Sequence, residues 1–443
     1  MDSKALTKIQ SAVLITIILV AAVGGGAAYV IWSASQPPPE NIKIGICADL
    51  DNADGRRVWQ AAVLAAEQVN TEGGVLGRNF TIVAEDDDDE VLPADIAVAS
   101  NAMTKLITLD KVDFVVSNGL PGVLVPHQEI CSQHKIILFG VRGANDNFTQ
   151  RVLDNYDKYK YFFKFSPPNS SSVADGMLGD ILTVANYTGF TKVAFLGQES
   201  STVRQILAGL NESLPNKGLE IVYTGLFQVA TTDFTSGFAA LEAAGAEILV
   251  PLIVTQASVS FIKEWHDRQS PCVVWGIMYG ADQKTFWDLT EGKCEYATAT
   301  CYPVVVGYPL TNKTVPTREA YIARWGTVPT SSAVAVYDGI RFILPDAIRR
   351  AGTQDTEALI KALENTNVET SSARHFVFTS SHDIMIGTDE PNNPAEDYVV
   401  MGYFQWQSNK ALVPMKPTEI MKEANATYLY PPWKGPWSSR QSP

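Results

Sequence analysis

The sequence predicts an α/β fold made of two doubly wound parallel sheets. From Ile42 onwards, apolar runs typical of buried strands alternate with amphipathic segments typical of helices. The alternation occurs twice, and the prolines of YFFKFSPPNSSS at residues 161–172 separate the two series. A chain of 443 residues also exceeds what one hydrophobic core usually fills, so two lobes are expected.

The stretch from Ile42 to Glu90 is the first strand, helix, strand unit. A helix is expected between Arg56 and Asn70, because apolar residues recur there on one helical face. These residues are Val58, Ala62, Ala65, Ala66 and Val69. Glycines at 73–74 can adopt the left-handed conformation that ends a helix. Since a crossover helix joins strands that point the same way, the sheet is expected to be parallel.

The remaining elements follow the same alternation. In the first lobe, helices are expected at 92–108 and 123–133, and strands at 112–116 and 136–139. In the second lobe, helices are expected at 173–185, 203–214, 234–244 and 257–268, and strands at 193–196, 220–227, 248–254 and 272–277. Long helices at 316–324 and 333–351 and hairpin-like segments at 375–387 and 399–414 complete the chain.

The N-terminal segment predicts a membrane anchor. No residue between Lys8 and Glu40 is charged, and residues 9–32 are long enough to cross a bilayer as one transmembrane helix. Lys4 and Lys8 place the N-terminus in the cytoplasm and the body outside. A cleaved signal peptide is the alternative, with residues 33–35 as the cleavage region. KALTKIQSAVLITIILV also resembles archaeal pilin-type signals, which are cut before the apolar segment and leave it attached.

Composition and motifs exclude several classes of function. A net charge of -14 makes nucleic acid an unsuitable partner. The sequence contains no HExxH, no GxSxG and no phosphate-binding loop, so no enzyme activity and no cofactor are expected. The acidic run EDDDDE at 85–90 is interpreted as a solvated turn, because adjacent acids cannot all converge on one calcium ion. No metal site is expected.

Sequons and cysteines suggest covalent features of an extracytoplasmic protein. Seven Asn-x-Ser/Thr sequons are candidates for glycosylation. They begin at Asn79, Asn147, Asn169, Asn186, Asn211, Asn312 and Asn425. The five cysteines cannot all pair within the chain. Cys272 and Cys294 each precede an expected strand segment and are a disulfide candidate, and a pair of Cys294 with Cys301 competes equally.

Four segments, in this order, resemble a known family. They are GRRVWQAAVLAAEQVNTEGGVLGR, TTDFTSGFAALEAAGAEILV, SSAVAVYDGIRFILPDAIRRAG and MGYFQWQ. Together they resemble the leucine/isoleucine/valine-binding type of extracytoplasmic solute-binding protein, which feeds ABC transporters, across about residues 41–435. The resemblance implies the type I periplasmic binding protein fold. The chain would then cross between the lobes three times, near Phe165, Pro303 and Arg374.

The implied organisation has five parts. Residues 1–32 would be the anchor or signal segment, and residues 33–40, with three consecutive prolines, a stiff tether. Residues 41–164 and 305–373 would form lobe I, and residues 165–304 and 374–434 lobe II. Residues 435–443 would be a tail. A small-molecule ligand would bind where the carboxyl ends of both sheets meet, and an ABC permease would be the protein partner.

The loops after the strands supply the candidate ligand contacts. Backbone N–H groups in such loops and at helix N-termini can bind a carboxylate. In lobe I the candidates are Asp51, Asp54, Ser117, Asn118, Gly119, Leu120, Gly140, Val141, Arg142 and Gly143. In lobe II they are Gln198, Glu199, Ser200, Thr255, Gln256 and Tyr279.

Two of these loops depart from what the resemblance implies. Arg142 stands where small residues are expected, so it either pairs bidentately with a ligand carboxylate or lies solvated at the rim. A carboxylate for a ligand ammonium is expected after the VTQ strand, but Gln256 and Ala257 stand there. Glu199 is the substitute from the neighbouring loop. This favours an amide, a peptide-like solute or another polar solute over a free aliphatic amino acid.

The expected function is therefore that of a membrane-anchored receptor on the cell surface. It would capture a small polar organic solute, such as an amino acid, an amide or a short peptide-like molecule, and deliver it to the permease. Two alternatives remain: a ligand-sensing receptor, and a structural subunit of a surface lattice or filament built on the same fold.

Overall fold

The computed structural model describes residues 40–88, 95–301, 303–387, 397–399, 402–416, 421–422 and 424–438. Residues 42–443 form one compact unit. The expected membrane segment at 9–32 and residues 33–39 of the tether lie outside the described residues. Within the described residues, no helix combines the length and apolar character needed to cross a membrane.

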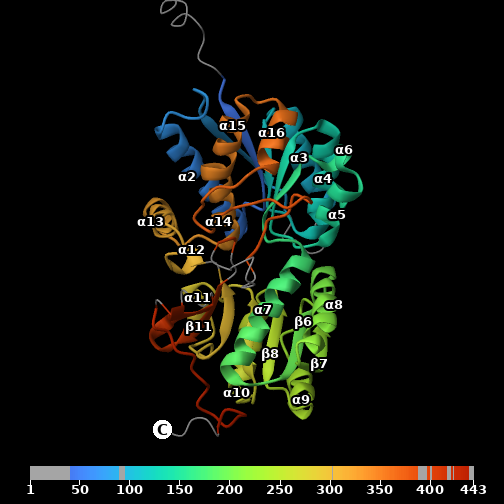
Figure 1. Ribbon diagram of the computed structural model, residues 1–443, viewed down its shortest axis with the longest axis vertical. Coiled ribbons are helices and arrows are strands. Elements are labelled where there is room, and N and C mark those ends of the chain that lie inside the picture. Colours follow the sequence, from blue (N-terminus) through green and yellow to red (C-terminus); the bar gives the residue numbers. More distant parts are fainter. Residues whose placement is uncertain are drawn as a thin grey trace, which may run out of the picture. The chain divides into compact units, whose positions relative to one another are not determined.

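The first sheet has five parallel strands in the order β2-β1-β3-β4-β5. They are β1 (Ile42–Cys47), β2 (Phe80–Glu85), β3 (Phe114–Ser117), β4 (Ile137–Val141) and β5 (Phe162–Ser166). Helices cover both faces (Figure 1). Ile44 and Ile46 of β1 pack in the cluster that includes the helix after β1, whereas Cys47 packs in the cluster on the other face. This alternation is the signature of a strand buried on both sides, so a doubly wound first lobe is confirmed.

The helices of this lobe come from two parts of the chain. The first part supplies α2 (Ala53–Thr71), α3 (Ile96–Thr108), α4 (Pro121–His134), α5 (Asp146–Asp154) and α6 (Tyr156–Tyr159). The returning chain supplies α12 (Pro303–Val306), α13 (Thr314–Trp325), α14 (Ser331–Asp338), the π-helix η1 (Gly339–Ile343), α15 (Leu344–Ala351) and α16 (Thr356–Glu364). Helices α14 and α2 pack against each other, so part of the chain beyond residue 305 lies in the core of the first sheet.

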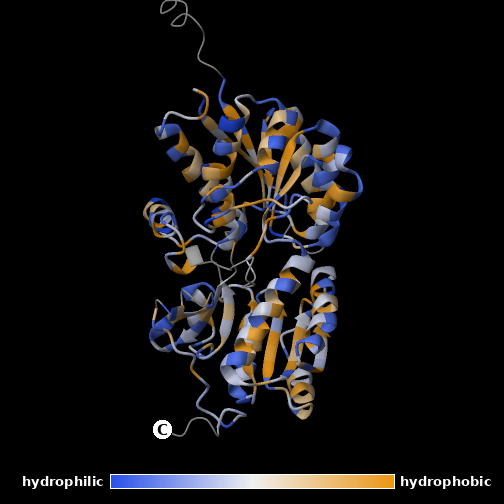
Figure 2. Cartoon of the chain, viewed as in Figure 1, coloured by the Kyte–Doolittle hydropathy of each residue, from blue (hydrophilic) through white to orange (hydrophobic). Residues whose placement is uncertain are grey.

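The second sheet has seven strands in the order β12-β11-β10-β9-β8-β6-β7. The parallel strands are β6 (Lys192–Gln198), β7 (Glu220–Phe227), β8 (Ile248–Ile253), β9 (Val273–Met278) and β10 (Thr298–Cys301). The hairpin of β11 (Gly402–Gln407) and β12 (Ala411–Lys416), with the 3-10 turn η2 (Ser408–Lys410), pairs antiparallel with β10. The helices are α7 (Ser170–Thr188), α8 (Ser201–Asn216), α9 (Thr235–Ala243), α10 (Ala257–Asp267) and α11 (Lys284–Leu289). Figure 2 shows hydrophobic residues concentrated on the strands.

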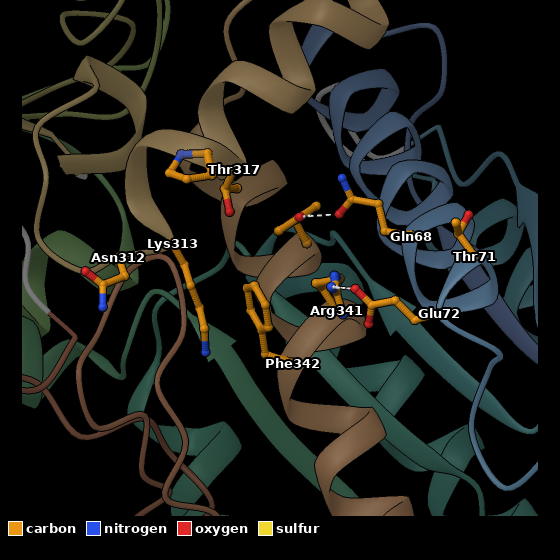
Figure 3. Close-up of a pocket in the computed structure, with 10 residues that line it drawn as sticks. Gln68, Thr71, Glu72, Asn312, Lys313, Thr317, Arg341 and Phe342 are labelled. Atoms are coloured by element: carbon orange, nitrogen blue, oxygen red, sulfur yellow. Dashed lines mark hydrogen bonds and ion pairs between the residues drawn. The ribbon is translucent and has the colours of Figure 1, made fainter.

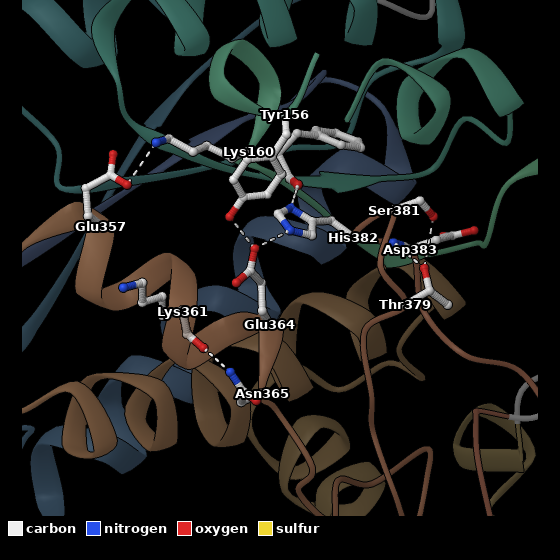
Figure 4. A network of polar contacts seen from close by, with 11 residues as sticks. Tyr156, Lys160, Glu357, Lys361, Glu364, Asn365, Thr379, Ser381, His382 and Asp383 are labelled. Atoms are coloured by element: carbon white, nitrogen blue, oxygen red, sulfur yellow. Dashed lines mark hydrogen bonds and ion pairs between the residues drawn. The ribbon is translucent and has the colours of Figure 1, made fainter. Parts of the chain in front are cut away.

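The chain remains with the first lobe further than the expected crossing near Arg374. Phe376, Phe378 and Val399 belong to the core cluster of the first sheet. His382 stacks on Phe163 with ring centroids 4.0 Å apart, and its imidazole lies between the Phe162 carbonyl and the Glu364 carboxylate (Figure 4). The chain therefore still belongs to the first lobe at His382.

The C-terminal segment is also more integrated than a tail. Trp437 is fully buried in the core of the second lobe, and its ring lies 6.0 Å from that of Tyr430. Its indole N–H donates to the carbonyl oxygens of Pro431 and Trp433. The boundary expected at residue 435 is therefore not a structural boundary, because apolar aromatic residues on both sides of it fill one core.

The expected disulfide between Cys272 and Cys294 is wrong. Both residues are buried free thiols, which also excludes the alternative pair of Cys294 with Cys301. The Cys272 thiol instead donates to the Ala246 carbonyl at 3.2 Å. Burial raises the pKa of each thiol to about 12, which suppresses the thiolate that disulfide formation requires.

Candidate ligand-binding site

The loops singled out in the sequence do follow the carboxyl ends of the strands. In the first lobe, residues 48–52 follow β1, residues 118–120 follow β3 and residues 142–145 follow β4. In the second lobe, equivalent loops follow β6, β8 and β9. Carboxyl ends of parallel strands meet at one edge of a sheet, so each set of loops lies together.

Contacts join the loops of one sheet to those of the other. The Ala144 carbonyl, after β4, accepts hydrogen bonds from Ser170 Oγ at 3.2 Å and from Thr202 Oγ1 at 2.5 Å. The Asn145 side chain lies 3.5 Å from Ser201 Oγ at the N-terminus of α8. The carboxyl-end loops of β4 and β6 therefore face each other, as the family resemblance implies.

The loop after β9 contains a carboxylate that the sequence interpretation missed. The pKa of Asp282 is raised to about 6, mainly by burial, and the carboxylate of Asp54 from the other lobe contributes to the rise, whereas a hydrogen bond from Gln283 and the charge of Arg57 oppose it. Asp54 is itself buried at the N-terminus of α2. Two carboxylates from opposite lobes thus lie within electrostatic reach of each other. The available signal was that Asp282 is the first acidic residue after the strand VVWGIM.

The loop after β3 is bonded to both Asp54 and the helix behind it. Asn118 is buried, its Nδ2 donates to Asp54 Oδ2 at 3.3 Å, and its Oδ1 has no hydrogen-bond partner within the described part of the chain. Ser117 Oγ instead lies 2.8 Å from His127 Nδ1, so this hydroxyl is turned toward α4. Of the two side chains, Asn118 is the one positioned beside the carboxylate pair.

The loop after β4 is held in an unusual backbone conformation. Arg142 has φ 64° and Gly143 has φ 35°, and a Cβ at Gly143 would lie 3.0 Å from the Gly119 carbonyl oxygen. The loops after β3 and β4 therefore approach each other closely at Gly143, where a glycine both leaves room for the Gly119 carbonyl and adopts a positive φ without strain. The Arg142 carbonyl accepts a hydrogen bond from the buried Lys164 ammonium, while its side chain is half-buried.

The second-lobe candidates differ in their surroundings. Gln198 Oε1 and Thr255 Oγ1 are buried and have no hydrogen-bond partner among the described residues. Glu199 is held by Arg204 through two contacts of 2.6 and 2.7 Å. An ion pair of this kind competes with a ligand ammonium, so Asp282 is better suited than Glu199 to the role that the sequence interpretation gave to Glu199.

The other candidates have backbone roles or lie at the surface. The Ser200 hydroxyl caps α8 by accepting from the Val203 N–H at 3.2 Å. The Tyr279 carbonyl accepts from Ser258 Oγ at 2.8 Å. Gly140 and Val141 are buried in β4, Leu120 is half-buried before α4, and Asp51 and Gln256 are exposed.

A separate cavity of about 500 Å³ opens on the first lobe between α2, α13 and η1 (Figure 3). An ion pair of Arg341 with Glu72 lies at one side of it, and the Lys313 ammonium lies 4.5 Å from the centre of the Phe342 ring. Its lining is Gln68, Thr71, Glu72, Asn312, Lys313, Pro316, Thr317, Tyr337, Arg341 and Phe342. None of the candidate ligand contacts lines this cavity.

The sequons differ in accessibility. Six of the seven asparagines are exposed: Asn79, Asn147, Asn186, Asn211, Asn312 and Asn425. Asn169 instead caps α7, where its Oδ1 accepts from the Ser172 N–H at 2.8 Å and its Nδ2 donates to Thr149 Oγ1 at 3.0 Å. A glycan on Asn169 would break this cap.

The chain belongs to the periplasmic binding protein family, whose model matches residues 41–387. It is 23% identical over 356 residues to a Leu/Ile/Val-binding protein homolog of Brucella abortus, covering 78% of this chain and 84% of that protein. It is 27% identical over 214 residues to an amino acid binding protein of Pseudomonas aeruginosa, a match that covers 47% of this chain and only about half (53%) of that protein.

Solved structures share the fold. A Silicibacter pomeroyi protein assigned to branched-chain amino acid ABC transport has a TM-score of 0.75 at 18% identity, covering 89% of this chain and all (100%) of that one. A branched-chain amino acid substrate-binding protein of Streptococcus pneumoniae, in complex with isoleucine, has a TM-score of 0.64 at 17% identity, covering 84% and 99%. A Rhodopseudomonas palustris protein in complex with benzoate also has a TM-score of 0.64, at 15% identity, covering 84% and 95%.

Proposed function

We propose that this protein is an extracytoplasmic receptor that binds a free amino acid between the carboxyl-end loops of its two sheets and delivers it to an ABC permease. The observation that carries the proposal is the approach of Asp282 and Asp54 from opposite lobes. Asp54 is buried and Asp282 is half-buried, so their carboxylates repel each other, and an ammonium group between them removes that repulsion. A ligand with this group would hold the two lobes together.

The opposite end of such a ligand is suited to the first-lobe loops. The contact between Gly119 and Gly143 leaves the loops after β3 and β4 without side chains at their closest point. The Gly122 N–H, in the first turn of α4, would bind a carboxylate there. Pro121 has no N–H, and the N–H groups of Val123 and Leu124 donate to the Leu120 carbonyl. The presence of Asp282 changes the ligand class expected from the sequence, because an acidic partner for an amino group is present after all.

The remaining parts of the proposal rest on the sequence. Residues 9–32 would anchor the body outside the cytoplasmic membrane and raise its effective concentration near the permease. The exposed asparagines of the sequons would be the candidates for glycosylation. Binding would involve lobe closure around the ligand and no covalent chemistry.

The first test is a thermal-shift screen of the full chain in detergent. Free amino acids should raise the melting temperature, whereas carboxylic acids of the same side chain that lack the amino group should not. Asp282→Asn should weaken amino acid binding by about 100-fold, since a buried charged hydrogen bond contributes about 2–3 kcal/mol. Asp288→Asn, which alters an exposed carboxylate of α11 paired with Lys410, is the matched control and should bind normally.

Equal shifts with the deaminated acids, or normal amino acid binding by Asp282→Asn, would contradict the assignment of Asp282. Shifts produced only by sugars would contradict the proposed ligand class as a whole. Isothermal titration calorimetry on the same samples measures the affinities.

Amino acid binding should also weaken in acid because of Asp282. Its pKa is raised to about 6 by burial, so the carboxylate is protonated below that pH and cannot pair with an ammonium. Affinity should fall by up to about tenfold per pH unit between pH 6 and 5. The free energy of unfolding of the unliganded protein should change in the opposite direction. Because the carboxyl pKa is raised in the folded state, Asp282 contributes stability at low pH, and this contribution is lost as the pH rises through about 6. Asp282→Asn should remove both dependences in calorimetric titrations.

A further inference from the structure

Three side chains with metal-binding atoms meet inside the first lobe. Cys47 ends β1, Asp87 lies two residues beyond β2, and His127 is in α4. One ligand atom from each lies within 4.8 Å of the other two, and all three residues are fully buried. We propose that Cys47, Asp87 and His127 bind one divalent cation of the zinc class, at a site distinct from the amino acid site.

The distances suit a small ion. If all three separations were at the 4.8 Å limit, the centre of the triangle would lie about 2.8 Å from each ligand atom. Zinc bonds to Cys, His and Asp are roughly 2.0–2.3 Å long. Each ligand atom would therefore move inward by less than about 1 Å, which a side-chain adjustment without backbone movement can supply.

The environment of His127 prepares one ring nitrogen for a metal. Nε2 lies 2.9 Å from the Ala99 carbonyl, which only accepts hydrogen bonds, so Nε2 carries the proton and Nδ1 has the lone pair. An imidazole whose other N–H is held by a carbonyl is the usual arrangement of a metal-binding histidine.

The register between β1 and β3 places the side chains of Cys47 and Ser117 on the same face of the sheet. Cys47 and Ser117 are paired in the register, so their side chains leave the sheet on one face. Ser117 Oγ lies 2.8 Å from His127 Nδ1 and is buried. On metal binding this hydroxyl would give up Nδ1, and its oxygen would lie next to a fourth coordination position.

The donor set selects the metal. A thiolate and an imidazole favour zinc and similar transition metals over calcium or magnesium, which prefer oxygen ligands. Asp87 comes from the acidic run that the sequence interpretation treated as a solvated turn, yet its side chain is completely buried. A cation beside it would make the burial of this carboxylate favourable.

Cobalt binding to the full chain, produced without a polyhistidine tag and treated with chelator, tests the proposal. Co²⁺ replaces Zn²⁺ in such sites, and a bond from a cysteine thiolate gives an ultraviolet charge-transfer absorption. We expect one Co²⁺ per chain, this absorption, and its displacement by one equivalent of Zn²⁺. Cys47→Ser should abolish the absorption and weaken metal binding by more than about 100-fold, beyond the loss that follows removal of a second-shell partner.

Cys131→Ser is the matched control, because Cys131 is also a buried thiol of this lobe but lies 3.6 Å from Met103 Sδ. It should keep the cobalt absorption. Asp87→Asn provides a second variant if Cys47→Ser does not fold, and should weaken Co²⁺ binding while preserving the thiolate band at saturation. The proposal is overturned if the wild-type chain gives no charge-transfer absorption with Co²⁺, or if that absorption survives Cys47→Ser and is lost in Cys131→Ser.

Discussion

Replacing Lys164 by methionine should lower the free energy of unfolding by about 3–5 kcal/mol, because two buried carbonyl acceptors lose their donor at a cost of roughly 1–3 kcal/mol each. Lys164 is fully buried in β5, and burial lowers its pKa to about 7 although Asp383 opposes the shift. Its ammonium donates to the carbonyl oxygens of Arg142 and Ser166. The substitution would leave these carbonyls without their donor and would remove the positive charge that lowers the pKa of Asp383.

Chemical denaturation of the Lys164 variant measures this loss. Lys105→Met is the matched control, because Lys105 is half-exposed and its ion pair with Glu85 lies at the surface. Such a pair contributes at most about 1 kcal/mol. Because the Arg142 carbonyl belongs to the loop after β4, amino acid affinity should fall as well in Lys164→Met. A loss no larger than that of the control would show that the buried Lys164 ammonium and its two hydrogen bonds do not stabilise the lobe.

Gly55→Ala should destabilise the protein by about 3 kcal/mol, in the upper part of the range for overpacking. An added Cβ at Gly55 would lie only 2.0 Å from the Asp49 carbonyl oxygen, and a backbone atom cannot rotate away. The loop after β1 would have to shift, and Asp54 would shift with it. We therefore expect weaker amino acid binding in addition to a lower melting temperature.

Gly122→Ala is the stability control for this substitution. Gly122 lies in the first turn of α4, and an added Cβ there has no neighbour within 4 Å. Alanine should be neutral or stabilise the helix by up to about 1 kcal/mol. If denaturation gave Gly55→Ala the same stability as Gly122→Ala, the close approach of Gly55 to Asp49 would have no energetic weight.

The fold was predictable because its signal is local and repeated. Alternating buried strands and amphipathic helices, such as the helix with Val58 and Val69, indicate parallel sheets without any knowledge of long-range contacts. The crossing near Arg374 was misplaced because Phe376 and Phe378 have the alternation of a hairpin, and that pattern does not say which lobe the hairpin joins. The burial of Trp437 in lobe II was not predictable either, because it depends on contacts with residues far away in the sequence.

The site was predictable only in outline. The candidate loops could be located from the predicted strand ends, because ligands of parallel α/β sheets bind at the carboxyl ends of the strands. Asp282 was missed because its importance comes from its approach to Asp54, more than 200 positions earlier in the chain. Glu199 was favoured in its place because nothing in the local sequence shows that Arg204 pairs with it. The burial of Asp87 was missed for a similar reason. Its acidic neighbours in the sequence indicate a solvent-exposed turn, although the Asp87 side chain is buried.

The position of the β11–β12 hairpin determines when the second lobe can be completed during synthesis. Strand β11 pairs with β10 at the edge of the parallel strands, although about 100 residues separate them, and these residues belong to the first lobe. Trp406 and Trp437 then fill the second-lobe core. A chain emerging from the ribosome therefore leaves an open sheet edge until β11 is available and an incomplete core until Trp437 is available.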